Sequence, residues 1–189
     1  MKKLIWLVDM SLDGFMSGVN GELDWLAADI DDEMWADVND LLSGVDATLF
    51  GRVTYQNFEN YWPTVPNKPA SPKNELDFSH WIEATPKTVV SKTLRKLPWK
   101  NSTLLNGDVA TEIARMKSGY GKSVLMFGSC NLASCLLEMR LIDELHMRIH
   151  PVILGAGRPL FRERSEHKLT LMKSRLFGSG VAEVRYEVS

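Results

Sequence analysis

Two short segments of the chain share a plan that suits the binding of an anion. In LFGRVTYQNF, residues 49–58, and LMFGSCNLAS, residues 125–134, an apolar run ends at a glycine and polar residues follow. This pattern predicts a strand that turns tightly into a helix, whose first N–H groups are unpaired and accessible beside the glycine. Two such turns side by side would suit a pyrophosphate. A plain turn without a ligand is the alternative for either segment alone.

Three other motifs fit their usual chemistry less well. MKSGYGKS, residues 116–123, resembles the end of a P-loop, but Met116 stands where that motif needs a glycine. GAGRP, residues 155–159, lacks the third glycine of a dinucleotide-binding fingerprint, so we expect it to border a site. His146 and His150 have the spacing of a helical metal pair, yet they alternate with apolar residues as one polar face of a strand does. We therefore expect no metal site.

The composition predicts one globular domain over residues 1–189. Hydrophobic residues make up 44% of the chain and charged residues 24%, and the formal net charge is -2. The dispersed lysines and arginines predict neither a nucleic-acid-binding face nor a membrane anchor. Asp9 interrupts the first apolar run too early for a signal peptide, and Cys130 and Cys135 suit reduced thiols, so we expect a cytoplasmic protein.

Alternating strand and helix patterns predict the elements that would position the two turns. Strands are predicted at residues 3–8, 46–51, 87–94, 123–128 and 143–155, with a further short strand at 103–107. Helices are predicted at residues 31–45, 108–121 and 131–141. Residues 61–86 hold five of the eight prolines and are expected to be irregular, and residues 168–189 predict two strands around a Gly-Ser turn.

This order of elements predicts an α/β protein. The expected architecture is a three-layer α/β/α sandwich, with a mostly parallel central sheet and an antiparallel C-terminal edge. In such sheets ligands bind at the carboxyl ends of the strands, which is where both glycine turns would lie.

Together these segments resemble the dihydrofolate reductase-like superfamily, and within it the branch that contains the reductase domain of riboflavin biosynthesis. The resemblance spans nearly the whole chain and rests on SLDGF, GELDW, LFGRVTY, VVSKTL and the run from FGSCNL through LIDELHMRIHPVILGAGRPLF. It implies a dihydrofolate reductase-like fold and an NADPH-dependent oxidoreductase. The implied substrate is a small planar heterocycle, pterin-like or pyrimidine-like, as for 5-amino-6-(5-phosphoribosylamino)uracil reductase or dihydrofolate reductase.

The resemblance also implies which residues hold the cofactor. Those expected around it are Gly128, Ser129, Cys130, Asn131 and Leu132 at the phosphates, Gly51, Arg52, Val53 and Thr54 on the other side of the dinucleotide, Ser91 and Lys92 at the 2'-phosphate, and Met10 and Trp25 at the nicotinamide half. Arg52 and Lys92 suit a phosphate dianion chemically. If an anion meets the backbone of Ser129, we expect Ser129→Leu to weaken binding with little effect on stability.

Asp24 and Phe127 are the candidates for contact with the substrate. Phe127 stands where riboflavin reductases carry a glutamate, and the position of the folate reductase carboxylate falls on Ile30. Asp9, at the end of the first strand, is the first candidate for proton donor, because partial desolvation there would suit general acid chemistry. Asp13 is the second, although its glycine turn fits a structural role about equally well.

Two further expectations concern assembly and activity. The family habit and the apolar character of residues 146–154 predict a homodimer. The alternative to a reductase is a nucleotide-binding or oligomeric scaffold that kept the fold without the chemistry.

Overall fold

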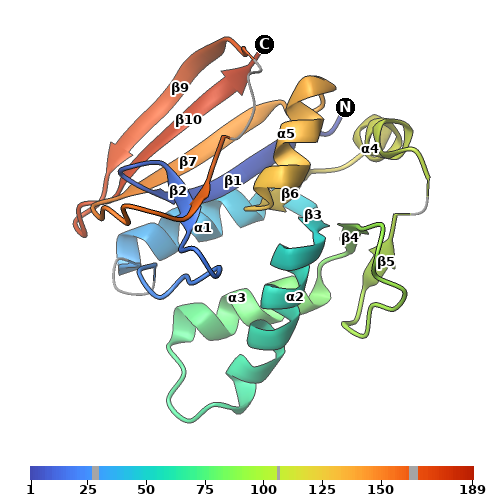
Figure 1. Cartoon of the computed structure of the whole chain (residues 1–189). Helices are drawn as coiled ribbons and strands as arrows, with labels where there is room; N and C mark the ends of the chain where they lie inside the picture. Colours follow the sequence, from blue (N-terminus) through green and yellow to red (C-terminus); the bar gives the residue numbers. More distant parts are fainter. Residues whose placement is uncertain (27–29, 106, 162–165) are drawn as a thin grey trace.

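The computed structural model describes residues 1–26, 30–105, 107–161 and 166–189, and its centre is an eight-stranded sheet (Figure 1). The strands are β1 (Leu4–Ser11), β2 (Phe15–Ser17), β3 (Val45–Gly51), β4 (Lys87–Val90), β5 (Ser102–Leu104), β6 (Ser123–Phe127), β7 (Glu144–His150), β8 (Arg158–Pro159), β9 (Leu169–Leu176) and β10 (Ala182–Val188). The helices are α1 (Asp32–Ser43), α2 (Arg52–Tyr61), α3 (Lys73–Ala84), α4 (Val109–Ser118) and α5 (Cys130–Glu138), with a 3₁₀ helix, η1 (Trp62–Asn67).

The sheet has the mixed topology that the sequence predicts. Its strands lie in the order β5-β4-β3-β6-β1-β7-β10-β9, and the first six are parallel. β10 and β9 run antiparallel and form the C-terminal edge. β2 and β8 pair separately as a two-stranded ribbon. Within the described ranges, every helix is too short or too polar to cross a membrane.

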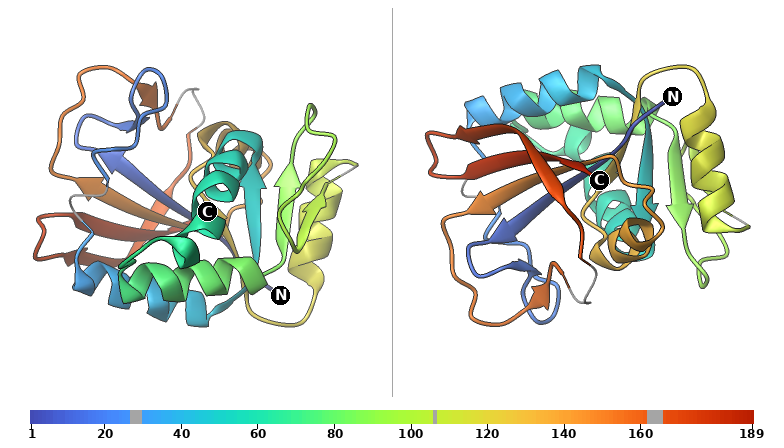
Figure 2. Two further views of the ribbon diagram at one scale, coloured as in Figure 1. Left: turned by 90° about the horizontal axis from the view of Figure 1, so that it is seen from below. Right: turned by 90° about the horizontal axis from the view of Figure 1, so that it is seen from above.

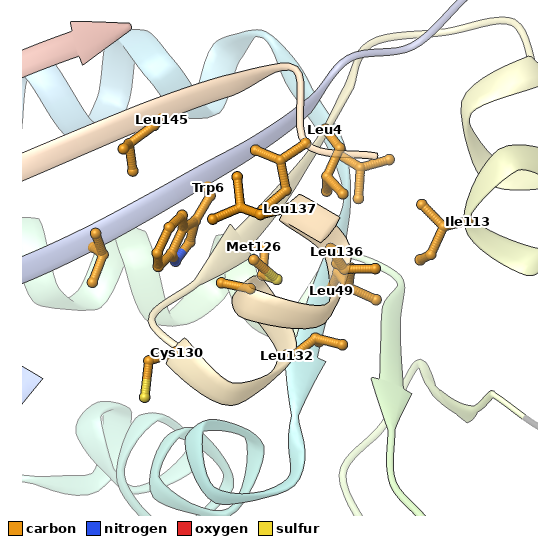
Figure 3. Packing of buried hydrophobic residues seen from close by; sticks show 14 of the residues in the cluster. Leu4, Trp6, Leu49, Ile113, Met126, Cys130, Leu132, Leu136, Leu137 and Leu145 are labelled. Carbon is orange, nitrogen blue, oxygen red and sulfur yellow. The ribbon is translucent and has the colours of Figure 1, made fainter. Parts of the chain in front are cut away.

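Alternation along the central strand β1 divides the core into two layers. Leu4 and Trp6 point to the face covered by α4 and α5, where they join a cluster with Leu136 (Figure 3). Ile5 and Leu7 point to the opposite face, which α1 and α3 cover (Figure 2). A strand buried on both faces therefore lies between two apolar layers, as a parallel sheet requires. The three-layer prediction is confirmed.

The expectation that residues 61–86 are irregular is wrong for residues 73–84, which form α3. The prolines of this region lie outside the helix: Pro72 precedes its first residue and Pro86 follows its end. Between them, Phe78 and Ile82 are four residues apart and are both buried in the core. The position of the prolines matters more than their number, because a proline just before a helix does not interrupt it.

The alternation predicted for His146 and His150 is confirmed, and it places charge inside the protein. His146, Arg148 and His150 face the same side of β7 and are all buried. Nε of Arg148 donates to Glu183 on β10 at 3.0 Å. These three side chains form a row along β7, and the contact of Arg148 with Glu183 joins the parallel part of the sheet to its antiparallel edge. His150 ends the row beside the candidate site.

Candidate functional site

A cavity of about 300 Å³ lies at the carboxyl ends of β1, β3 and β6, three neighbouring parallel strands. Both glycine turns line it, through residues 51–54 and 127–132. The end of β1, the β2–β8 ribbon, the segment after β2 and the first turns of α2 complete the wall; the segment after β2 contributes Gly21, Leu23 and Leu26. As the sequence predicts, the two glycine turns therefore lie together at the carboxyl ends of the strands. The volume is at the lower end of the range for small-molecule sites.

Each turn leads into a helix whose N-terminus lacks a side-chain cap. Gly51 is the N-cap of α2 and Ser129 the N-cap of α5, and neither helix receives a hydrogen bond from its N-cap side chain. Gly128 and Ser129 both have positive φ, 47° and 59°, which aligns the start of α5 with the cavity. The first N–H groups of both helices are thus available to a ligand, and both dipoles favour an anion.

The Ser129 hydroxyl bonds the two turns to each other. Its Oγ accepts a hydrogen bond from the backbone N–H of Gly51 at 3.0 Å and donates one to Oγ1 of Thr54 at 2.9 Å. On the other side, the indole N–H of Trp6 donates to the carbonyl of Gly128 at 2.6 Å. The β3–α2 and β6–α5 turns therefore form one rigid unit, anchored to β1.

This bond overturns the expectation that Ser129→Leu would leave stability unchanged. Ser129 is only 8% exposed and adopts a left-handed conformation that a leucine tolerates poorly. Leucine would break both hydrogen bonds of the hydroxyl, so the substitution would perturb folding and binding together.

The cavity carries positive charge. Arg52, the first residue of α2, and Arg158, on β8, both line it. In the part of the chain that the structure describes, neither guanidinium forms an ion pair with a carboxylate, and Arg52 donates instead to Oε1 of Gln56 at 3.1 Å. Arg52, at the N-terminus of α2 and without a paired carboxylate among the described residues, favours an anionic ligand.

Asp9 contributes a carboxylate to the same cavity. Its Oδ1 lies 2.9 Å from Nε2 of the fully buried His150, and its side chain is 30% exposed. The ring of Trp25 meets the His150 ring edge-on, with centroids 5.2 Å apart. A carboxyl and an imidazole in hydrogen-bond contact can hold a proton at the cavity wall.

Six predicted site residues lie outside the cavity lining: Met10, Asp13, Asp24, Trp25, Ser91 and Lys92. Ser91 accepts from the amides of Thr93 and Leu94 in the turn after β4, and Lys92 is exposed beside it. Trp25 reaches the site through the His150 ring. The cofactor and substrate contacts expected for these residues stay predictions.

Asp13 has a structural part in this arrangement. Its carboxylate accepts hydrogen bonds from the Ser11 hydroxyl at 2.6 Å and from the amides of Gly155 and Leu154 at 2.7 and 3.1 Å. The Ser11 hydroxyl, and then these two amides, hold the pKa of Asp13 below its ordinary value. A carboxyl that stays ionised is poorly suited to donate a proton.

Sequence reasoning missed several lining residues. Asn57 and Phe58 follow Val53 and Thr54 by one helical turn, so the i, i+4 spacing could have identified them. Arg158 has no such signal, because its strand is two residues long and pairs with β2, about 140 residues away in the sequence. The expectation that GAGRP borders the site is nevertheless confirmed by the place of Arg158.

Comparison with known proteins gives a consistent result. The family model described as RibD C-terminal domain matches residues 2–182. YyaP of Bacillus subtilis (strain 168), an uncharacterized protein, is 30% identical over 186 residues, which cover 98% of this chain and 94% of YyaP.

Two solved structures have the same fold. A protein of Shewanella sp. PV-4, for which a role in riboflavin biosynthesis has been suggested, is 24% identical with a TM-score of 0.75, and 99% of each chain is covered. A diaminohydroxyphosphoribosylaminopyrimidine deaminase/5-amino-6-(5-phosphoribosylamino)uracil reductase of Thermotoga maritima is 17% identical with a TM-score of 0.67. That likeness covers all of this chain and 57% of the Thermotoga protein.

Ser129→Ala tests the bond between the turns. We expect it to lower the free energy of unfolding by about 1 to 3 kcal/mol, because the Gly51 N–H and the Thr54 hydroxyl lose their partner. Urea denaturation measures this change. Ser134→Ala is the control, since among the described residues the Ser134 hydroxyl bonds to the Cys130 carbonyl within α5 and to no group of the other turn. Equal stability of both variants and the parent would contradict the structural role of Ser129.

Proposed function

We propose that this chain, which belongs to the RibD C-terminal domain family and has its dihydrofolate reductase-like fold, is an NADPH-dependent reductase of a small planar heterocycle. The observation that carries the proposal is the pair of uncapped helix N-termini, joined through Ser129, that face one cavity with Arg52 beside them. Reductases of this branch use a nicotinamide cofactor, and a dinucleotide brings a pyrophosphate that such a double N-terminus fits.

The residues present fit NADPH on chemical grounds. The N-termini of α2 and α5 would hold the pyrophosphate through their free N–H groups. Arg52 would meet phosphate as a charge-assisted donor, and Lys92, exposed after the neighbouring strand β4, is the second predicted contact of the 2'-phosphate. When bound, the cofactor supplies a hydride.

The chain itself would orient the rings, exclude water and deliver a proton. Leu7, Phe58 and Phe127 give the cavity apolar walls, with the Phe58 and Phe127 rings 5.1 Å apart, and such walls suit a flat heterocycle. Asp9, held by His150, would keep the proton that the reduced ring takes up. Phe127 occupies the position of the riboflavin reductase glutamate, so an apolar contact replaces a polar one there.

The reductase and the scaffold make different predictions for NADPH turnover. A reductase consumes NADPH when a pterin, pyrimidine or flavin is added, and the absorbance of the reduced nicotinamide falls. A scaffold binds the nucleotide without consuming it. Asp9→Asn is the matched variant, since it keeps the side-chain shape and removes the acid. Turnover that is unchanged in Asp9→Asn would remove Asp9 from the mechanism.

We expect NADPH to bind about tenfold or more tightly than NADH, because the 2'-phosphate that Arg52 and Lys92 are expected to meet is present only in NADPH. Calorimetry on the parent protein, Arg52→Gln and Lys92→Gln measures the preference. Lys92→Gln should lose NADPH affinity and keep its affinity for NADH, which serves as the internal control, whereas Arg52→Gln should lose more affinity for NADPH than for NADH. Equal dissociation constants for the two cofactors in the parent protein would contradict the proposal.

We further propose that the protein is a cytoplasmic homodimer. The apolar residues within 146–154 do not supply the contact between the two copies. β7 is an interior strand, and its apolar side faces the α5 layer of the core. The outermost strand is β9, where Leu171, Met172 and Leu176 are 55%, 50% and 72% exposed. An exposed apolar edge strand of this kind favours pairing with a second copy.

Light scattering at micromolar concentration is expected to give twice the 21.4 kDa of one chain. Leu176→Glu should shift the protein toward monomer, because it places a charge on the exposed strand. A parent protein that is already monomeric would contradict the dimer.

A further inference from the structure

The β2–β8 ribbon forms the outer wall of the cavity. It pairs Phe15 with Pro159 and Ser17 with Arg158, apart from the main sheet, and it projects beyond the strand ends (Figure 2). Met16, Ser17 and Arg158 line the cavity from this ribbon. A Cβ added to Gly128 would lie 3.8 Å from Sδ of Met16, so the ribbon reaches across to the β6–α5 turn. Cys130, at the start of α5, lines the same region and is 5% exposed.

The Asp13 carboxylate links the segment that precedes β2 to the segment that precedes β8. Asp13 lies between β1 and β2, and its oxygens bind the amides of Leu154 and Gly155, between β7 and β8. Beside this contact, the Leu12 N–H donates to the Val152 carbonyl at 2.8 Å. An ionised carboxylate can accept several N–H and O–H bonds at once, whereas an amide side chain offers a single acceptor oxygen.

Close packing fixes the ribbon at a second point. A Cβ added to Gly157 would lie 2.2 Å from the backbone carbonyl oxygen of Ser17, a distance that backbone atoms cannot accept. Residue 157 must be glycine for β8 to approach β2 and to place Arg158 in the cavity. The ribbon therefore depends on two separate features, the hydrogen bonds of the Asp13 carboxylate and the close steric fit at Gly157.

We propose that Asp13 is a positioning residue, whose carboxylate holds the β2–β8 ribbon against the β6–α5 turn and so closes the cavity in front of Cys130. Asp13 lies outside the cavity lining and acts through Met16 and Arg158. This assignment replaces its sequence-based role as a proton donor. It rests on the proposed function only where the ribbon is said to support NADPH binding, and the closure itself can be tested without any ligand.

The Cys130 thiol serves as the reporter of closure. In a Cys135→Ser background, which removes the exposed thiol, Ellman's reagent reports on Cys130. We expect Asp13→Asn to raise the rate of Cys130 modification by about tenfold, because losing the carboxylate raises the population in which the ribbon is open. Gly157→Ala should raise the rate as well, with Asp13 intact, because it displaces the ribbon sterically.

Asp108→Asn is the matched control. Asp108 is also an exposed carboxylate that accepts a backbone N–H, from Thr111 at 2.9 Å, but it caps α4 away from the cavity. Asp108→Asn should lower the melting temperature about as much as Asp13→Asn does, and it should leave the rate of Cys130 modification unchanged. If Asp13→Asn lowers the melting temperature but its Cys130 rate equals that of Asp108→Asn, Asp13 is only a local structural residue and the proposal is wrong.

NADPH affinity gives the second readout. We expect Asp13→Asn and Gly157→Ala each to raise the dissociation constant of NADPH about fivefold or more, while Asp108→Asn keeps the parent value. If the parent protein does not bind NADPH, the proposed function fails while the thiol rates still decide the role of Asp13. If Asp13→Asn binds NADPH as the parent does and Cys130 reacts faster, the ribbon closes the cavity but does not support the cofactor, and that part of the proposal is overturned.

Discussion

The site depends on the hydroxyl of Ser129. This one group accepts the N–H of Gly51 and donates to Thr54, so it joins two helix N-termini that come from strands almost 80 residues apart. Each N-terminus alone is an ordinary end of a helix, with N–H groups that water can satisfy. Joined and aimed at one cavity, they give a concentration of N–H donors and dipole ends that suits a polyanion. The proposed reductase function follows from this arrangement more than from any single side chain.

The sheet supplies the frame that makes the bond between the turns possible. β3 and β6 are neighbours, and β1 lies on the other side of β6, so three carboxyl ends meet beside one another. Trp6 and Leu7, adjacent on β1, both bind Gly128: the indole holds its carbonyl and the Leu7 carbonyl accepts its N–H at 2.9 Å. On β7, the buried side chains of His146, Arg148 and His150 lie in a row, and His150 at its end contacts Asp9 at the cavity. The candidate proton donor, the two turns proposed to hold the cofactor and the cavity wall are thus fixed by separate elements around one edge of the sheet.

Local patterns predicted the parts of this site but not their connections. The strand-glycine-helix plan of the two turns could be identified because it is written within ten residues of sequence. The bond from Ser129 to Gly51 depends on strand order, which a single sequence does not reveal. The high proline content of residues 61–86 hides α3, because the nearest prolines lie just outside its two ends. Arg158 gives no signal because a two-residue strand has no periodicity. The role of Asp13 depends on two amides about 140 residues away in the sequence, which local patterns do not reveal.

Backbone amide NMR during an NADPH titration tests the joined turns most directly. We expect the largest shifts in the ¹H–¹⁵N spectrum to fall together on residues 52–54 and 130–132, and both sets to saturate at the same NADPH concentration. Shifts confined to one turn, or sets that saturate at different concentrations, would contradict a single binding unit made from two helix N-termini.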